Sequence, residues 1–225
     1  MTDKQKARLI AILEKHFGKR KDFYHIVTGP KRETWFTAES IAALSRAQSG
    51  NQSRGFIIFG EKNYSTILRD LKLKASSRKG LSKIPDIVGY SFGKETIAFV
   101  LEAKLVDELD NDKAITILED LRDQLLRAKA LLPSTTVIGM VYGVHHLSRA
   151  VGKQKLPSGS PRYVTVQPKH FFNLLANQIE DVFSSPTCKW FDQRKIVLVS
   201  NLQSVKPLSG KWYGEVSMGM AIFEI

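Results

Sequence analysis

The chain has 225 residues, 43% of them hydrophobic, and carries 34 lysines and arginines against 22 aspartates and glutamates, a net charge of +12. This length suits one large domain with its own core, and the absence of a long apolar run excludes a membrane span of about 20 residues. The basic excess favours a polyanionic partner such as nucleic acid.

The first 55 residues are expected to form an N-terminal helical layer. Apolar residues recur at helical spacing over 7–16 and over 37–48, which predicts two helices. Thr37 is the predicted N-cap of the second helix, and Glu39 would lie in its first turn, where a carboxylate interacts favourably with the helix dipole.

A third helix is predicted from Glu61 to Leu71, and a basic stretch follows it. Tyr64, Leu68 and Leu71 share one apolar side of this helix. An acid-free segment then leads to Pro85, and its charges could follow a phosphate backbone. We predict nucleic-acid binding by these residues: Lys72, Lys74, Arg78, Lys79 and Lys83.

The centre of the chain reads as a β-hairpin. Segments 86–92 and 96–104 are rich in Ile, Val, Tyr, Phe and Thr, and Gly93 supplies the turn. Folding back at Gly93 brings Asp86 and Glu102 together at one edge of the sheet.

The hairpin also places an ammonium beside the two acids. Because side chains alternate faces along a strand, Glu102 and Lys104 share one face and Ala103 points to the other. Two carboxylates at such an edge suit Mg²⁺, which takes hard oxygen ligands and keeps exchangeable waters. Lys104 could position the attacking water or offset the charge of a phosphoryl transition state. The spacing therefore predicts a site for cutting phosphodiesters.

Downstream elements continue an α/β pattern. A long helix is predicted over 111–132 and ends at Pro133, and the apolar run 135–144 reads as a strand buried on both faces. The last third contains three further predicted elements, a helix over 168–184 and strands over 195–199 and 214–225.

The Pro85-Asp86 pair and the Glu102-Ala-Lys104 triplet resemble the PD-(D/E)xK nuclease superfamily, which has the restriction-endonuclease-like fold. The resemblance implies one α/β domain with a mixed central sheet in the order αβββαβ, flanked by helices. The core would cover about 60–145, with the helical layer 1–55 before it and a C-terminal addition over 146–225.

The same resemblance implies a Mg²⁺-dependent DNA endonuclease of restriction or defence type, with Mn²⁺ as a substitute. Asp86, Glu102 and Lys104 would be catalytic, and the two acids would bind the metal. The alternatives left open are a non-catalytic nucleic-acid-binding protein on the same fold and an RNA endonuclease. A homodimer is open as well. The lone Cys188 and a start without an apolar signal segment lead us to expect a cytoplasmic protein.

Members of this superfamily commonly carry a further acid on the helix before the strand meander. Glu61 is the first candidate for this catalytic and metal-binding acid, Glu39 the second and Asp70 the third. Gln124, on the predicted helix 111–132, lies where RecB-like members place a glutamine, so we also predict a nucleic-acid contact there.

Overall fold

The computed structural model describes residues 1–19, 32–46, 56–60, 62–74, 80–91, 96–107, 109, 111–150, 168–183, 188–205 and 212–225. The elements in chain order are α1 (Asp3–Gly18), α3 (Arg32–Arg46), β1 (Phe56–Phe59), α4 (Tyr64–Asp70), β2 (Ile87–Ser91), β3 (Ile97–Val106), α5 (Asn111–Leu131), β4 (Thr136–Ala150), α6 (Pro168–Phe183), β5 (Lys189–Trp190), β6 (Ile196–Val205) and β7 (Trp212–Glu224).

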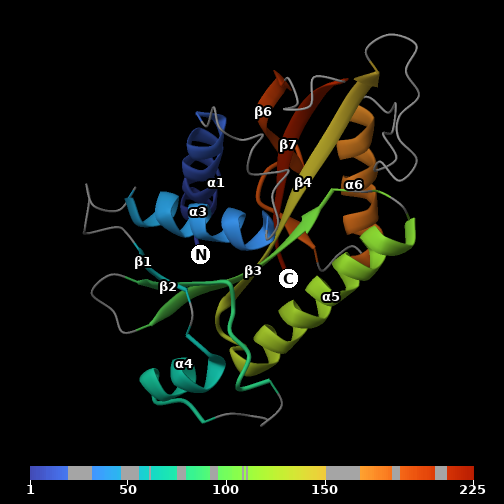
Figure 1. Ribbon diagram of the computed structural model, residues 1–225. Coiled ribbons are helices and arrows are strands. Elements are labelled where there is room, and N and C mark those ends of the chain that lie inside the picture. Colours follow the sequence, from blue (N-terminus) through green and yellow to red (C-terminus); the bar gives the residue numbers. More distant parts are fainter. Residues whose placement is uncertain are drawn as a thin grey trace.

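One mixed sheet organises the described elements. Its strands follow the order β1-β2-β3-β4-β7-β5, and β6 also pairs with β7. Only β3 and β4 are parallel among the described strands, and helix α5 makes the crossover that a parallel pair requires. The other pairs are antiparallel, including the long β4–β7 pair that dominates Figure 1. The predicted α/β class with a mixed central sheet flanked by helices is confirmed.

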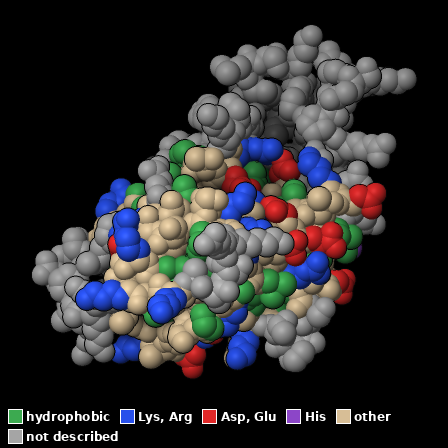
Figure 2. All heavy atoms as spheres, turned by 90° about the horizontal axis from the view of Figure 1, so that it is seen from below, with side chains coloured by type: hydrophobic (Ala, Val, Ile, Leu, Met, Phe, Trp, Pro, Cys, Tyr) green, Lys and Arg blue, Asp and Glu red, His purple; other side chains and the backbone are tan. Residues whose placement is uncertain are grey.

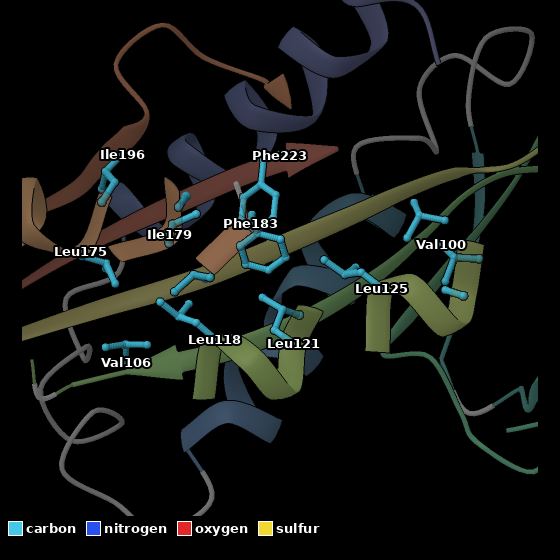
Figure 3. Close-up of a cluster of buried hydrophobic side chains, with 14 of the residues drawn as sticks. Val100, Val106, Leu118, Leu121, Leu125, Leu175, Ile179, Phe183, Ile196 and Phe223 are labelled. Carbon is cyan, nitrogen blue, oxygen red and sulfur yellow. The ribbon is translucent and has the colours of Figure 1, made fainter. Parts of the chain in front are cut away.

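The sheet has an apolar core on each face. Helices α1 and α3 cover one face through residues such as Leu13 and Phe36. Helices α4, α5 and α6 cover the other, and Figure 3 shows α5 and α6 side chains such as Leu121 and Ile179 gathered against the strands. Helical spacing on α5 and strand alternation on β3 produce these two packed layers.

The central hairpin forms as predicted. Strands β2 and β3 pair antiparallel, with Ile87 opposite Leu101. The turn at Gly93 lies outside the described residues. Helix α5 and strand β4 match the predicted helix and strand after the hairpin, although β4 continues to Ala150.

Three predicted helix starts are wrong, the first because helix α1 begins at Asp3 and not at residue 7. Helix α3 begins at Arg32, so Thr37 is not an N-cap but a buried interior residue, and Glu39 is not in the first turn. Helix α4 begins at Tyr64, where the side chain of Asn63 accepts the Thr66 N–H and caps the helix. Glu61, the predicted start of that helix, lies outside the described residues.

Contacts with β4 fix the position of α3. The ring of Phe36 stacks on Tyr142 with centroids 4.8 Å apart, and the Ser40 hydroxyl lies 2.8 Å from that of Tyr142. These buried contacts explain why the helix extends past Thr37 towards its N-terminus, since packing outweighs a local capping preference.

The elements α3, β1, β2, β3, α5 and β4 follow the order helix, three antiparallel strands in sequence, helix, strand, with α4 inserted between β1 and β2. Helix α3 is therefore the helix that precedes the meander. No described helix combines the length and apolar character needed to cross a membrane.

Candidate active site

Strand β3 continues past the first residue of β2, so the last part of β3 has none of the described strands as a partner on that side. Two acids occupy this free edge. The last pair between these strands joins Ile87 to Leu101. Further along β3, the Ala103 N–H donates to Oδ2 of Asp86 at 2.7 Å and the Leu105 N–H donates to Oε2 of Glu33 at 3.2 Å. Both carboxylates replace a missing strand as hydrogen-bond acceptors, which draws them to the same edge.

Glu102 is a buried carboxylate. Its side chain is only 6% exposed, and the hydroxyl of Tyr64 donates to Oε1 at 3.0 Å. Burial, together with the charge of Asp86, raises the pKa of Glu102 to about 7. The same face of β3 carries Val100 and Val106 in the α5-side core, whereas Ala103 lies in the α3-side core, as the predicted alternation requires.

Asp86 shares this environment. Burial raises its pKa, and the nearby charge of Glu33 contributes to the rise, although the Ala103 N–H and the charge of Lys104 oppose it. The charges of Glu33 and Glu102 thus both interact with that of Asp86. Because carboxylates this close together repel one another, positive charge at this edge stabilises their ionised form.

Lys104 supplies one positive charge. Its ammonium lies 3.0 Å from Oδ2 of Asp120 on α5 and 3.7 Å from Oε1 of Glu33. Burial alone would lower the pKa of Lys104, but the hydrogen bond to Asp120 and the charges of Glu33 and Asp86 outweigh it, so the pKa is raised. Lys104 is thus held as an ammonium, which suits charge stabilisation and not proton abstraction.

The structure brings Glu33, an acid that sequence reasoning missed, to this edge beside Lys104. Glu39 instead lies 2.7 Å from Nε2 of His16, and Asp70 pairs with Lys62 at 3.0 Å. Glu61 lies outside the described residues. Glu33 could have been found from an earlier helix start, because the Gly29-Pro30 pair shortly before it signals a turn that a helix can follow.

The structure describes only some of the residues predicted to bind nucleic acid. Lys72, Lys74 and Lys83 are exposed in segments 71–74 and 80–86, whereas Arg78 and Lys79 lie outside the described residues. Figure 2 shows most acids of this face gathered on its right side, with lysines and arginines spread over both sides. Gln124 donates to Oδ2 of Asp120 at 2.9 Å and so holds the partner of Lys104.

A magnesium ion fits the chemistry of Asp86 and Glu102. Magnesium is commonly held by one or two carboxylates together with waters and substrate phosphates. Across the described ranges, no group of three or more His, Cys, Asp or Glu side chains is arranged so that it could hold a metal ion. An ion at Asp86 and Glu102 would therefore complete its shell with water and substrate oxygens.

No protein-family model matches this chain, and comparisons with curated proteins and with solved structures find no significant match. The function of the protein is therefore inferred from the chemistry of the site.

Proposed function

We propose that this protein is a Mg²⁺-dependent nuclease of the PD-(D/E)xK type that cuts phosphodiester bonds within DNA. The observation that carries the proposal is the edge of β3, where Asp86 and Glu102 meet with raised pKa values beside the ammonium of Lys104. The helix–meander–helix–strand order supports a restriction-endonuclease-like core, since that fold places these residues at a strand edge.

Each residue has a distinct task in this proposal. Asp86 and Glu102 would hold the metal at the strand edge. Magnesium bound there would polarise the phosphate and activate water. Lys104 stays protonated and stabilises the charge that develops on the phosphoryl oxygens. Asp120, fixed by Gln124, holds the ammonium in place.

Incubation of supercoiled plasmid with the purified protein tests this function directly. We expect nicked or linear DNA in the presence of Mg²⁺ or Mn²⁺ and intact plasmid in EDTA. Cleavage of RNA with plasmid left intact would instead support the RNA endonuclease. Binding of DNA without cleavage under any metal would favour the non-catalytic alternative.

Glu33 should matter more for cleavage than Glu39 on the same helix or Asp70 on α4. Glu33→Gln keeps an oxygen for the Leu105 N–H but removes the charge, so we expect cleavage to slow by roughly 10–100-fold, the scale for residues that orient metal ligands. The measurement is the initial rate of plasmid nicking with Mg²⁺.

Glu39→Gln is the matched control, because it changes the same type of side chain on α3 but faces His16. We expect its rate to stay within about twofold of wild type. A wild-type rate in Glu33→Gln together with slow cleavage in Glu61→Gln would return the upstream role to Glu61.

The exposed lysines beside α4 should add affinity without sequence preference. Replacing Lys72, Lys74 and Lys83 by glutamine is expected to reduce the slope of log affinity against log salt by about 0.9 for each phosphate that the protein no longer neutralises. Fluorescence anisotropy with a labelled duplex in EDTA measures this slope. A control variant with three exposed lysines elsewhere, Lys4, Lys15 and Lys169, should keep the wild-type slope. Equal slopes in the two triple variants would contradict the prediction.

A further inference from the structure

A polar stripe runs along one flank of α5 beside the candidate site. Asp120, Gln124 and Arg127 recur four and three residues apart, so they lie on one side of the helix. The buried side of α5, which includes Leu121 and Leu125, packs on the sheet next to this stripe. Asp120 contacts Lys104 and Gln124 donates to Asp120, whereas Arg127 lies further along the helix.

Arg127 lies near Tyr64, the residue that contacts Glu102 of the acid pair. Helix α5 crosses between the parallel strands β3 and β4, so it runs back along β3. Asp120 meets Lys104, and two turns later Arg127 comes near Tyr64, the residue whose hydroxyl donates to Glu102. Burial raises the pKa of Tyr64, and the charge of Arg127 acts against that rise. The charge of Lys104 therefore acts on Glu102, and the charge of Arg127 acts on Tyr64, the hydrogen-bond donor to Glu102.

The stem of Arg127 is fixed by the segment that carries Lys83. Gly80 has a φ of +85°, and a Cβ at this position would clash with Cδ of Arg127, so the stem packs closely on the glycine. Shortly after Gly80, the carbonyl of Lys83 accepts the Tyr64 N–H at 3.0 Å. Arg127 thus lies between the exposed basic segment and the acid pair.

The guanidinium of Arg127 forms no hydrogen bond or ion pair with the part of the chain that the structure describes. Arg122, on the opposite flank of α5, instead donates to the Val182 carbonyl at 3.3 Å. An arginine with a fixed stem and five available donors is well suited to bind phosphate oxygens in a bidentate manner.

We propose that Arg127 binds a backbone phosphate of the nucleic-acid strand next to the phosphate held at Asp86 and Glu102. This inference rests on the proposed nuclease function. The strand would pass the exposed lysines beside α4, contact Arg127 and then reach the acid pair. Arg127 is a substrate-binding residue in this arrangement, and Lys104 retains the stabilisation of the reacting phosphate.

Two substitutions separate charge from packing. Arg127→Met keeps an apolar stem against Gly80 but removes the charge, and Arg127→Lys keeps both stem and charge but loses the planar donor pair. The matched control is Arg122→Met on the opposite flank of the same helix. Binding of a labelled DNA duplex is measured in EDTA over a range of salt concentrations, cleavage is measured with Mg²⁺, and thermal unfolding checks the fold of every variant.

We expect Arg127→Met to bind about tenfold more weakly and to lose about 0.9 from the salt slope, with KM raised and kcat within about threefold of wild type. Arg127→Lys should keep the salt slope and regain part of the affinity. Arg122→Met should bind as wild type does. Wild-type affinity and slope in Arg127→Met, with a wild-type protein that binds and cuts DNA, would overturn this inference alone. A wild-type protein that neither binds nor cuts DNA would overturn the nuclease proposal and this inference with it.

Discussion

Replacing Lys104 by methionine is expected to reduce DNA cleavage by at least roughly 10²–10³-fold, the usual loss when one preorganised group that stabilises transition-state charge is removed. The substitution keeps the apolar stem, which is largely covered, and removes the ammonium that contacts Asp120 and Glu33. DNA binding should change little, since the stabilisation applies to the transition state more than to bound substrate. Single-turnover cleavage with Mg²⁺ measures the loss.

Asp86→Asn should give a similar loss for a different reason. The amide oxygen of asparagine can still accept the Ala103 N–H, so the strand edge keeps its hydrogen bond, but the carboxylate that would bind magnesium is gone. Lys15→Met, at an exposed position on α1 and on the opposite side of the sheet, is the matched control and should cut as wild type does. Wild-type cleavage by either Lys104→Met or Asp86→Asn would show that this edge is not the active site.

The metal-free protein is expected to lose about 3 kcal/mol of unfolding free energy through Glu102 as the pH rises from about 4.5 to about 7. The pKa of Glu102 is raised in the folded state, so below its ordinary pKa the group is protonated in both states and contributes no difference. Between the two pKa values only the unfolded state ionises, and stability falls with each pH increment. Above about 7 both states are ionised and the loss is complete.

Urea unfolding in EDTA between pH 4 and pH 8 measures this effect as the difference between wild type and Glu102→Gln. Glutamine keeps an acceptor for the Tyr64 hydroxyl and cannot ionise, so its curve should lack the loss and lie above wild type by about 3 kcal/mol at pH 8. Added Mg²⁺ should stabilise wild type at pH 8 and have little effect on Glu102→Gln. Glu119→Gln, at an exposed position on α5, is the control and should follow wild type. Parallel curves for Glu102→Gln and wild type would show that ionisation of Glu102 does not cause the loss of unfolding free energy.

The part of the site that lies on one hairpin could be predicted from the sequence. Alternation along a strand places Glu102 and Lys104 on the same face, and antiparallel pairing brings Asp86 to the same edge. These relations depend on residues close together in the chain, so local geometry determines them. The same local periodicity explains why helix α5 was predicted to within one residue, whereas strand β4 begins within one residue of its predicted start but continues to Ala150, six residues past its predicted end.

Which N-terminal acid reaches the site depended on tertiary contacts that no local sequence pattern contains. Thr37 is a good capping residue, and the prediction of a helix starting there made Glu39 a first-turn acid. In the folded protein Phe36 and Ser40 pack against Tyr142, which lies far along the chain, and Thr37 is buried inside a longer helix. Docking of that helix brings Glu33 to the Leu105 N–H.

The sequence by itself thus determined the α/β class and the acid–acid–lysine arrangement on the central hairpin, because strand alternation and helical spacing are local. Only the tertiary structure decided that Glu33 completes this edge, that Asp120 and Tyr64 hold Lys104 and Glu102, and that Arg127 flanks them. The physical reason is that strand β3 continues past its pairing with β2. Its N–H groups there donate to one local partner, Asp86, and to one partner that tertiary packing supplies, Glu33 on α3.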